Sequence, residues 1–167
     1  MTSPSTLELA AAAEALYRVL GRRAGEVRDD GYVVGLYEMA RSCGAVSLAL
    51  RERAGVAALS PTPVVAEVLE RAIDGDDTGA LAVYATTMVV LPRLLVALRD
   101  ARVVEPDPAN AEVLVQVTDV VVGALRRLAQ HAHDQAIYDD PTWQEAARGL
   151  SRTLEDAGYG ESLVISR

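Results

Sequence analysis

The sequence predicts an all-α protein in which four long helices form a bundle and two shorter helices are added to it. Thr62-Pro63, Asp107-Pro108 and Asp140-Pro141 each place a capping side chain before a proline, ahead of a segment with helical apolar spacing. A capping oxygen accepts a hydrogen bond from a first-turn amide, and proline fits the next position because the amide it lacks would have no partner there. Apolar residues also recur every three or four positions along most of the chain, which is the period of an amphipathic helix.

The first two long helices are expected at about residues 5–27 and 32–53. Ser5 and Glu8 form a capping box, in which the two residues cap each other's backbone amides. The apolar stripe of the first helix holds Leu9, Ala10, Ala13, Leu16, Tyr17, Leu20, Ala24 and Val27. The stripe of the second helix holds Val33, Leu36, Met39, Ala40, Cys43, Val46 and Leu50, while Glu38, Arg41 and Ala45 lie on the outer side.

The other two long helices are expected at about residues 78–102 and 108–138. The first of these is apolar nearly all round until Arg99, which predicts a position at the centre of the bundle or at a subunit interface. The second has no internal break, and at 1.5 Å per residue it would extend about 45 Å. Its inward face is predicted to hold Val113, Val117, Val120, Val121, Ala124, Leu128 and Ala132.

Two shorter helices complete the expected single domain of residues 1–167. One covers residues 63–73, and the other begins after Asp140 and ends at Gly158. Residues 1–4 are expected to form a flexible tail and residues 159–167 a C-terminal tail, in which Leu163-Val164-Ile165 is apolar enough to pack onto the bundle. This order matches a bundle with one crossover, which ferritin-like bundles share. An up-and-down bundle capped by the helix at 63–73 has the same sequence pattern.

Charge and composition exclude several classes of function. The net charge is −8, and the arginines are expected to be scattered over different helices, so we predict no binding to nucleic acid or to anionic lipid. All 16 basic residues are arginine, which excludes a Schiff-base lysine and a phosphate-binding loop that ends in Gly-Lys.

The sequence favours a cytoplasmic protein that does not span a membrane. Cys43 is the only cysteine and no signal segment opens the chain, so a reducing compartment is expected. Residues 80–98 are the most apolar stretch, but Arg93 lies within it, and a charge near the middle of a membrane span costs about 3 kcal/mol.

The pattern predicts neither a metal site nor a cofactor. A carboxylate-bridged di-metal bundle needs Glu-x-x-His on two helices, and that motif is absent. His131 and His133 are two residues apart, so they point to opposite sides of a helix and cannot bind one ion together.

Five residues are candidates for a ligand site. His131, Gln135 and Tyr138 fall on the inward face of the helix at 108–138, at its end, whereas His133 falls on the solvent side. Arg93 and Arg127 are the arginines that would bind an anionic ligand beside them. The alternatives are that His131 is a hydrogen-bonded core residue and that Arg93 lies on the one solvated strip of its helix.

These features predict a non-enzymatic protein that acts by binding a protein or a small anionic or apolar ligand. A homodimer is expected, with an interface on the helix at 78–102 or at 108–138, since their apolar surface must be covered. The alternative is a small helical lyase or isomerase that acts on an anionic metabolite, with His131 or Tyr138 as the acid or base.

Overall fold

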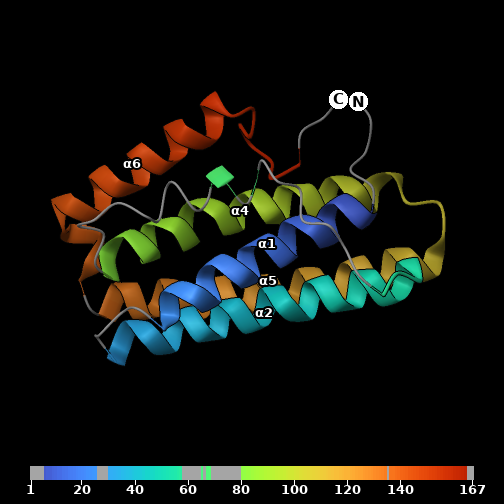
Figure 1. Cartoon of the computed structure of the whole chain (residues 1–167), viewed down its shortest axis with the longest axis horizontal. Coiled ribbons are helices and arrows are strands. Elements are labelled where there is room, and N and C mark those ends of the chain that lie inside the picture. The colour runs from blue at the N-terminus through green and yellow to red at the C-terminus, as the bar shows by residue number, and fades with distance from the viewer. Residues whose placement is uncertain are drawn as a thin grey trace.

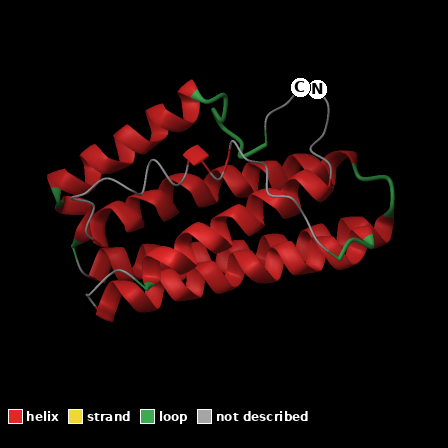
Figure 2. Ribbon diagram, viewed as in Figure 1, coloured by secondary structure: helices red, strands yellow, loops and turns green. Residues whose placement is uncertain are grey.

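The described part of the chain is mostly helical and has no strand (Figure 2). The structure is a computed structural model that describes residues 6–25, 30–57, 65, 67–68, 80–134 and 136–164. This confirms the all-α class predicted from the sequence.

Four long helices form the bundle: α1 (Thr6–Ala24), α2 (Asp30–Ala54), α4 (Ala80–Val104) and α5 (Pro108–Asp134). Helix α1 packs against α2, α2 against α5, α5 against α4, and α4 against α1, so the four helices enclose one core. The core is built from Ala, Val and Leu, and its largest fully buried side chains include Leu16, Met39 and Leu94.

The chain path favours the crossover order over the up-and-down order. Helices α2 and α4 run in the same direction, and each is antiparallel to the two helices it neighbours around the bundle (Figure 1). The connection between α2 and α4 is therefore a crossover, as ferritin-like bundles have between their second and third long helices.

A fifth helix, α6 (Pro141–Asp156), packs on the outside of α4. Within the described residues α4 contacts α1, α5 and α6, and Leu150 and Leu154 of α6 are buried, whereas Val103 and Val104 near the end of α4 are exposed. Part of the apolar surface of α4 is thus covered within one chain, and a dimer interface on α4 or α5 stays a prediction.

The shorter predicted helix at 63–73 lies mostly outside the described residues. Within it Val65, Glu67 and Val68 are helical, and both valines are buried. Residues 1–4 and the Thr62-Pro63 cap are also outside the described residues. In the predicted C-terminal tail Tyr159 and Leu163 are buried in the core, so residues 159–164 pack onto the bundle.

Both described proline caps form as predicted. The Ala109 amide donates to Asp107 Oδ1 over 2.9 Å at the start of α5, and the Thr142 amide donates to Asp140 Oδ1 over 2.8 Å at the start of α6. The Asp107 carboxylate also pairs with Arg53 at the end of α2 over 2.8 Å. This contact joins the end of α2 to the turn between α4 and α5.

The expectation that α5 runs to Tyr138 is wrong. The helix ends at Asp134, Ala136 adopts a left-handed conformation with φ 53°, and residues Ile137–Asp139 form a short 3₁₀ turn, η1. Asp140 must be extended because Pro141 follows it, and the chain needs a reversal before that point. Alanine seldom adopts this conformation, which is why the pattern did not indicate the break.

One member of the predicted inward face of α5 is also misplaced. Val120 is 40% exposed, whereas Leu114, which the pattern did not include, is buried. The other buried members, such as Val117, Val121 and Leu128, lie where the 3.6-residue period puts them.

One segment of α2, Val33–Ala54, is long and apolar enough to cross a membrane when only length and composition are considered. Much of it packs against α1 and α5, and a core helix of a bundle meets the same criterion.

Candidate functional site

The Arg93 side chain is hydrogen-bonded to the segment that follows α6. Its Nε donates to the carbonyl oxygens of Tyr159 and Gly160 at 3.2 and 2.8 Å, and its Nη2 donates to Ser151 Oγ at 2.8 Å. The Leu163 amide in turn donates to the Arg93 carbonyl at 3.3 Å. The side chain is 13% exposed, and burial lowers the pKa of its guanidinium. Arg93 therefore does not lie on a solvated strip, and its donors are used in holding this segment.

Arg127 faces a different side of the bundle. Its Nε contacts Glu38 Oε2 on α2 at 3.2 Å, and both side chains are exposed. Since Arg93 faces α6 and Arg127 faces α2, the structure does not bring the two predicted arginines together.

The three other predicted site residues are at the end of α5 and beyond it. His131 is partly buried in the last turn of α5, His133 is exposed, and Gln135 lies outside the described residues. Tyr138 lies on η1 instead of α5.

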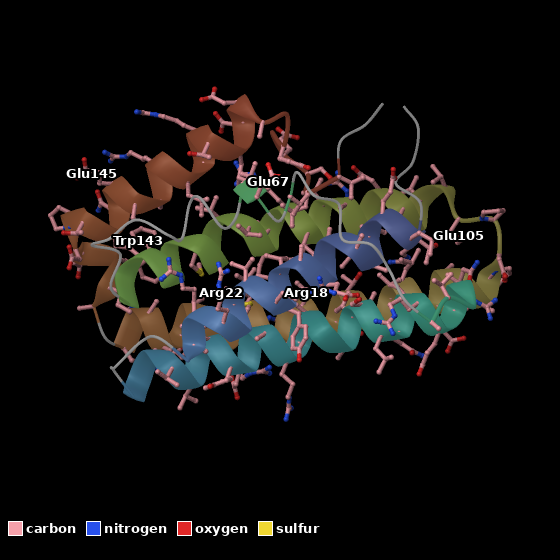
Figure 3. The ribbon with its side chains drawn as sticks, in the orientation of Figure 1. Arg18, Arg22, Glu67, Glu105, Trp143 and Glu145 are labelled. Carbon is pink, nitrogen blue, oxygen red and sulfur yellow. The ribbon has the colours of Figure 1, made fainter. Side chains whose placement is uncertain are left out.

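Tyr138 is packed like a core tyrosine. Its ring meets Trp143 edge-on, with centroids 5.1 Å apart, and its hydroxyl lies 3.8 Å from Met88 Sδ. Burial raises the pKa of its hydroxyl. Trp143 is at the start of α6 in Figure 3, so this contact fixes the turn between α5 and α6.

Among the described residues no group of three or more His, Cys, Asp or Glu side chains is placed to hold a metal ion. Cys43 is fully enclosed in the core, and burial raises the pKa of its thiol to about 12. It is therefore protonated and inert at neutral pH.

The structure reveals a different site, on the face that α1 and α2 share. A pocket of about 470 Å³ opens there between the last turns of α1 and the first half of α2. Two tyrosines and three arginines supply most of its lining: Tyr17, Tyr37, Arg18, Arg22 and Arg41. Arg18 and Arg22 lie one turn apart on α1 (Figure 3).

A second pocket of about 350 Å³ continues from the first along the same two helices. Tyr17 and Arg41 line both pockets, and the second adds Ser47, Leu48 and Arg51. The two hollows are therefore one groove that Tyr17 and Arg41 divide. Neither hollow is lined by any of the five residues predicted from the sequence.

A glycine on α2 places the tyrosine in this groove. A methyl group built on Gly44 would lie 3.1 Å from Cδ2 of the Tyr17 ring, so the ring lies flat against the glycine backbone. Tyr17 keeps 49% of its surface exposed, and Tyr37 keeps 53%. Large aromatic surfaces left open beside a pocket are typical of binding sites.

The groove is positively charged, although the chain as a whole is acidic. Four arginines line its two hollows, against one carboxylate, that of Glu14. Glu14 is only 13% exposed and is held by Arg18 at 2.7 Å and by Arg51 at 3.4 Å. No described residue pairs with Arg41, which is exposed and lines both hollows.

This arrangement corrects the expectation that the arginines are scattered. Arg22 and Arg51 are far apart in the sequence, but the antiparallel pairing of α1 and α2 puts them along one groove. The pattern also assigned Tyr17 to the core because it lies at the edge of the α1 stripe. Arg41 was correctly placed on the outer side of α2. The glycine opposite Tyr17, Gly44, could have indicated the groove, but only if the register of α1 against α2 had been known.

The charged groups of the groove are suited to binding an anion. Arginine stays charged at all ordinary pH values, and Glu14 forms ion pairs with Arg18 and Arg51. Comparison with known proteins adds no further constraint: no family model matches the chain, and no curated protein or solved structure is detectably similar to it.

Proposed function

We propose that this protein is a non-enzymatic binding protein and that the α1–α2 groove is its binding site for a ligand that carries negative charge and apolar surface. The observation that carries the proposal is Arg41, a cation with no partner among the described residues, between two half-exposed tyrosines in a pocket of about 470 Å³. Arginine binds carboxylate, sulfonate and phosphate groups, and tyrosine rings stack on flat apolar groups.

The enzyme alternative has less support. Of its two proposed acid or base residues, Tyr138 is packed against Trp143 and Met88, and His131 is partly buried in the last turn of α5. Its proposed anion-binding residue, Arg93, holds the C-terminal segment. A cytoplasmic location and a homodimer stay predictions.

Gly21 provides a sharp way to test the site. It lies in the interior of α1 and lines the larger pocket, and a methyl group built on it meets no atom within 4 Å. A larger side chain at this position would start in open space and extend into the pocket. Leucine also favours the helix over glycine by about 0.8 kcal/mol.

The experiment uses 8-anilinonaphthalene-1-sulfonate, a fluorescent aromatic anion, as the probe. Gly21→Leu and Arg41→Gln should each weaken its binding at least tenfold, while the melting temperature of Gly21→Leu stays equal or rises. Gly149→Leu on α6 and Arg126→Gln on α5 are the matched controls, because Gly149 also has open space and Arg126 is also exposed. Probe binding that is unchanged in both groove variants would refute the proposal.

A further inference from the structure

The groove continues beyond the pocket that a small ligand would fill. The outer side of α2 carries six residues at alternating spacings of three and four: Val34, Tyr37, Arg41, Gly44, Leu48 and Arg51. This is the heptad spacing with which one helix meets another. From Val34 to Arg51 the stripe extends about 26 Å, or roughly five helical turns.

The apolar members of this stripe are exposed. Val34 is 62% exposed and Leu48 is 50% exposed, and they lie on either side of Tyr37 and Arg41 along α2. The outer edge of α1 runs beside the stripe and contributes Tyr17, Arg18 and Gly21. Two antiparallel helices with a hollow between them form the groove into which the side chains of a third helix pack.

The charge of the groove selects the kind of helix. Its lining carries four arginines and one glutamate in a chain whose net charge is −8, so this face is strongly unlike the rest of the molecule. A partner with acidic residues on both sides of its apolar stripe would meet Arg18 on one side and Arg41 and Arg51 along the centre.

We infer that the α1–α2 groove binds an acidic amphipathic helix of a partner protein, about five turns long. The inference rests on the proposed function and names the occupant of the same site. A second copy bound face to face would bring arginines against arginines, and a nucleic acid would leave Val34 and Leu48 without apolar contacts.

The test uses an 18-residue labelled peptide with leucine at the a and d heptad positions and glutamate at the flanking e and g positions. The glutamates repel one another, so the peptide does not pair with itself. One control peptide has lysine in place of glutamate, and another has a central proline that breaks the helix. Binding is measured by fluorescence anisotropy at 0.05 and 0.5 M NaCl, which are chosen concentrations on either side of about 0.15 M.

The acidic peptide should bind, bind more weakly at the higher salt concentration, and bind at least ten times more tightly than either control peptide. Leu48→Asp and Arg41→Gln should each weaken binding of the acidic peptide at least tenfold. Val120→Asp and Arg126→Gln on α5 are the matched exposed controls and should leave it unchanged. Val34→Asp distinguishes the acidic-helix inference from the proposed function. It should weaken binding of the acidic peptide and leave the sulfonate probe bound in the Tyr17–Tyr37 pocket.

Four results would overturn the inference. If binding of the sulfonate probe depends on Arg41 but no peptide binds, the inference of an acidic helix is wrong while the proposed function stands. If neither binds, both are wrong. If sedimentation of the chain alone shows a dimer that Leu48→Asp dissociates, the occupant is a second copy. If single-stranded DNA displaces the peptide at a lower concentration than unlabelled peptide does, the groove binds nucleic acid.

Discussion

At the scale of single residues, burial determines what the one thiol can do. Cys43 is enclosed in the core, and burial raises the pKa of its thiol to about 12. In the unfolded chain the pKa returns to about 8.5. The native protein at pH 8 should therefore react with a disulfide reagent at least 100 times more slowly than the same protein in denaturant, since the thiolate is the reacting form. Complete labelling of the native protein within a minute would contradict this.

The cap of α6 and the second histidine of α5 make a contrasting pair of single residues. Asp140 accepts the Thr142 amide at 2.8 Å, whereas His133 is exposed. Asp140→Ala should lower the free energy of unfolding by about 1 kcal/mol, and His133→Ala should change it by less than about 0.5 kcal/mol. Denaturant unfolding measures both, with Asp140→Asn as the control that keeps a cap. A larger loss for His133→Ala would mean that the phase of α5 is wrong.

At the scale of elements, Arg93 attaches the segment after α6 to α4. Its guanidinium donates to the carbonyls of Tyr159 and Gly160, and Tyr159 and Leu163 of that segment are buried. Arg93→Met should destabilise the protein by about 2 kcal/mol, because the carbonyl oxygens of this segment and the Ser151 hydroxyl lose a charged donor.

The local readout for this variant is amide hydrogen exchange. The amides of Tyr159 and Leu163, which donate to the Leu154 and Arg93 carbonyls, should exchange faster in Arg93→Met, while those of α1 keep their protection. Arg148→Met, an exposed position on α6, is the control. Equal exchange in the two variants would show that Arg93 does not hold the segment.

The same scale shows how much of the fold the sequence predicts. The starts of α5 and α6 were predictable because Asp107 and Asp140 precede prolines, and the long-helix boundaries follow from apolar period. The end of α5 was not, since Ala136 adopts a left-handed conformation without the glycine that normally marks one. The groove was not predictable either: Tyr17 and Arg41 come together only through the register of α1 on α2, which depends on the close fit at Gly44.

At the scale of the whole molecule, Asp107 makes stability depend on pH. The hydrogen bond from the Ala109 amide, followed by the ion pair with Arg53, lowers the pKa of Asp107 below its ordinary value. A lowered folded-state pKa contributes stability above the unfolded pKa, and this contribution is lost as the pH falls through the folded-state value. The melting temperature of the native sequence should therefore exceed that of Asp107→Asn at pH 6.

The two melting temperatures should converge as the pH falls from about 5 to about 2, the range in which carboxyl groups with a lowered pKa become protonated. Thermal unfolding followed by circular dichroism measures the difference. Glu112→Gln serves as the control, because Glu112 is exposed in the first half of the same helix and its removal should leave no such convergence. A difference that is constant over the whole range would show that the charge of Asp107 contributes nothing.

The crossover between α2 and α4 also determines the order in which the chain can fold. Helices α1 and α2 pair with a short connection, as do α4 and α5, whereas the pairs α2–α5 and α1–α4 join distant parts of the chain. Local contacts form in microseconds, but distant contacts must first overcome the entropy of closing a long loop. Two helical hairpins are thus expected to form early and independently. Their docking would be the slow step, and until then the Ala, Val and Leu faces of both hairpins would be open to other chains.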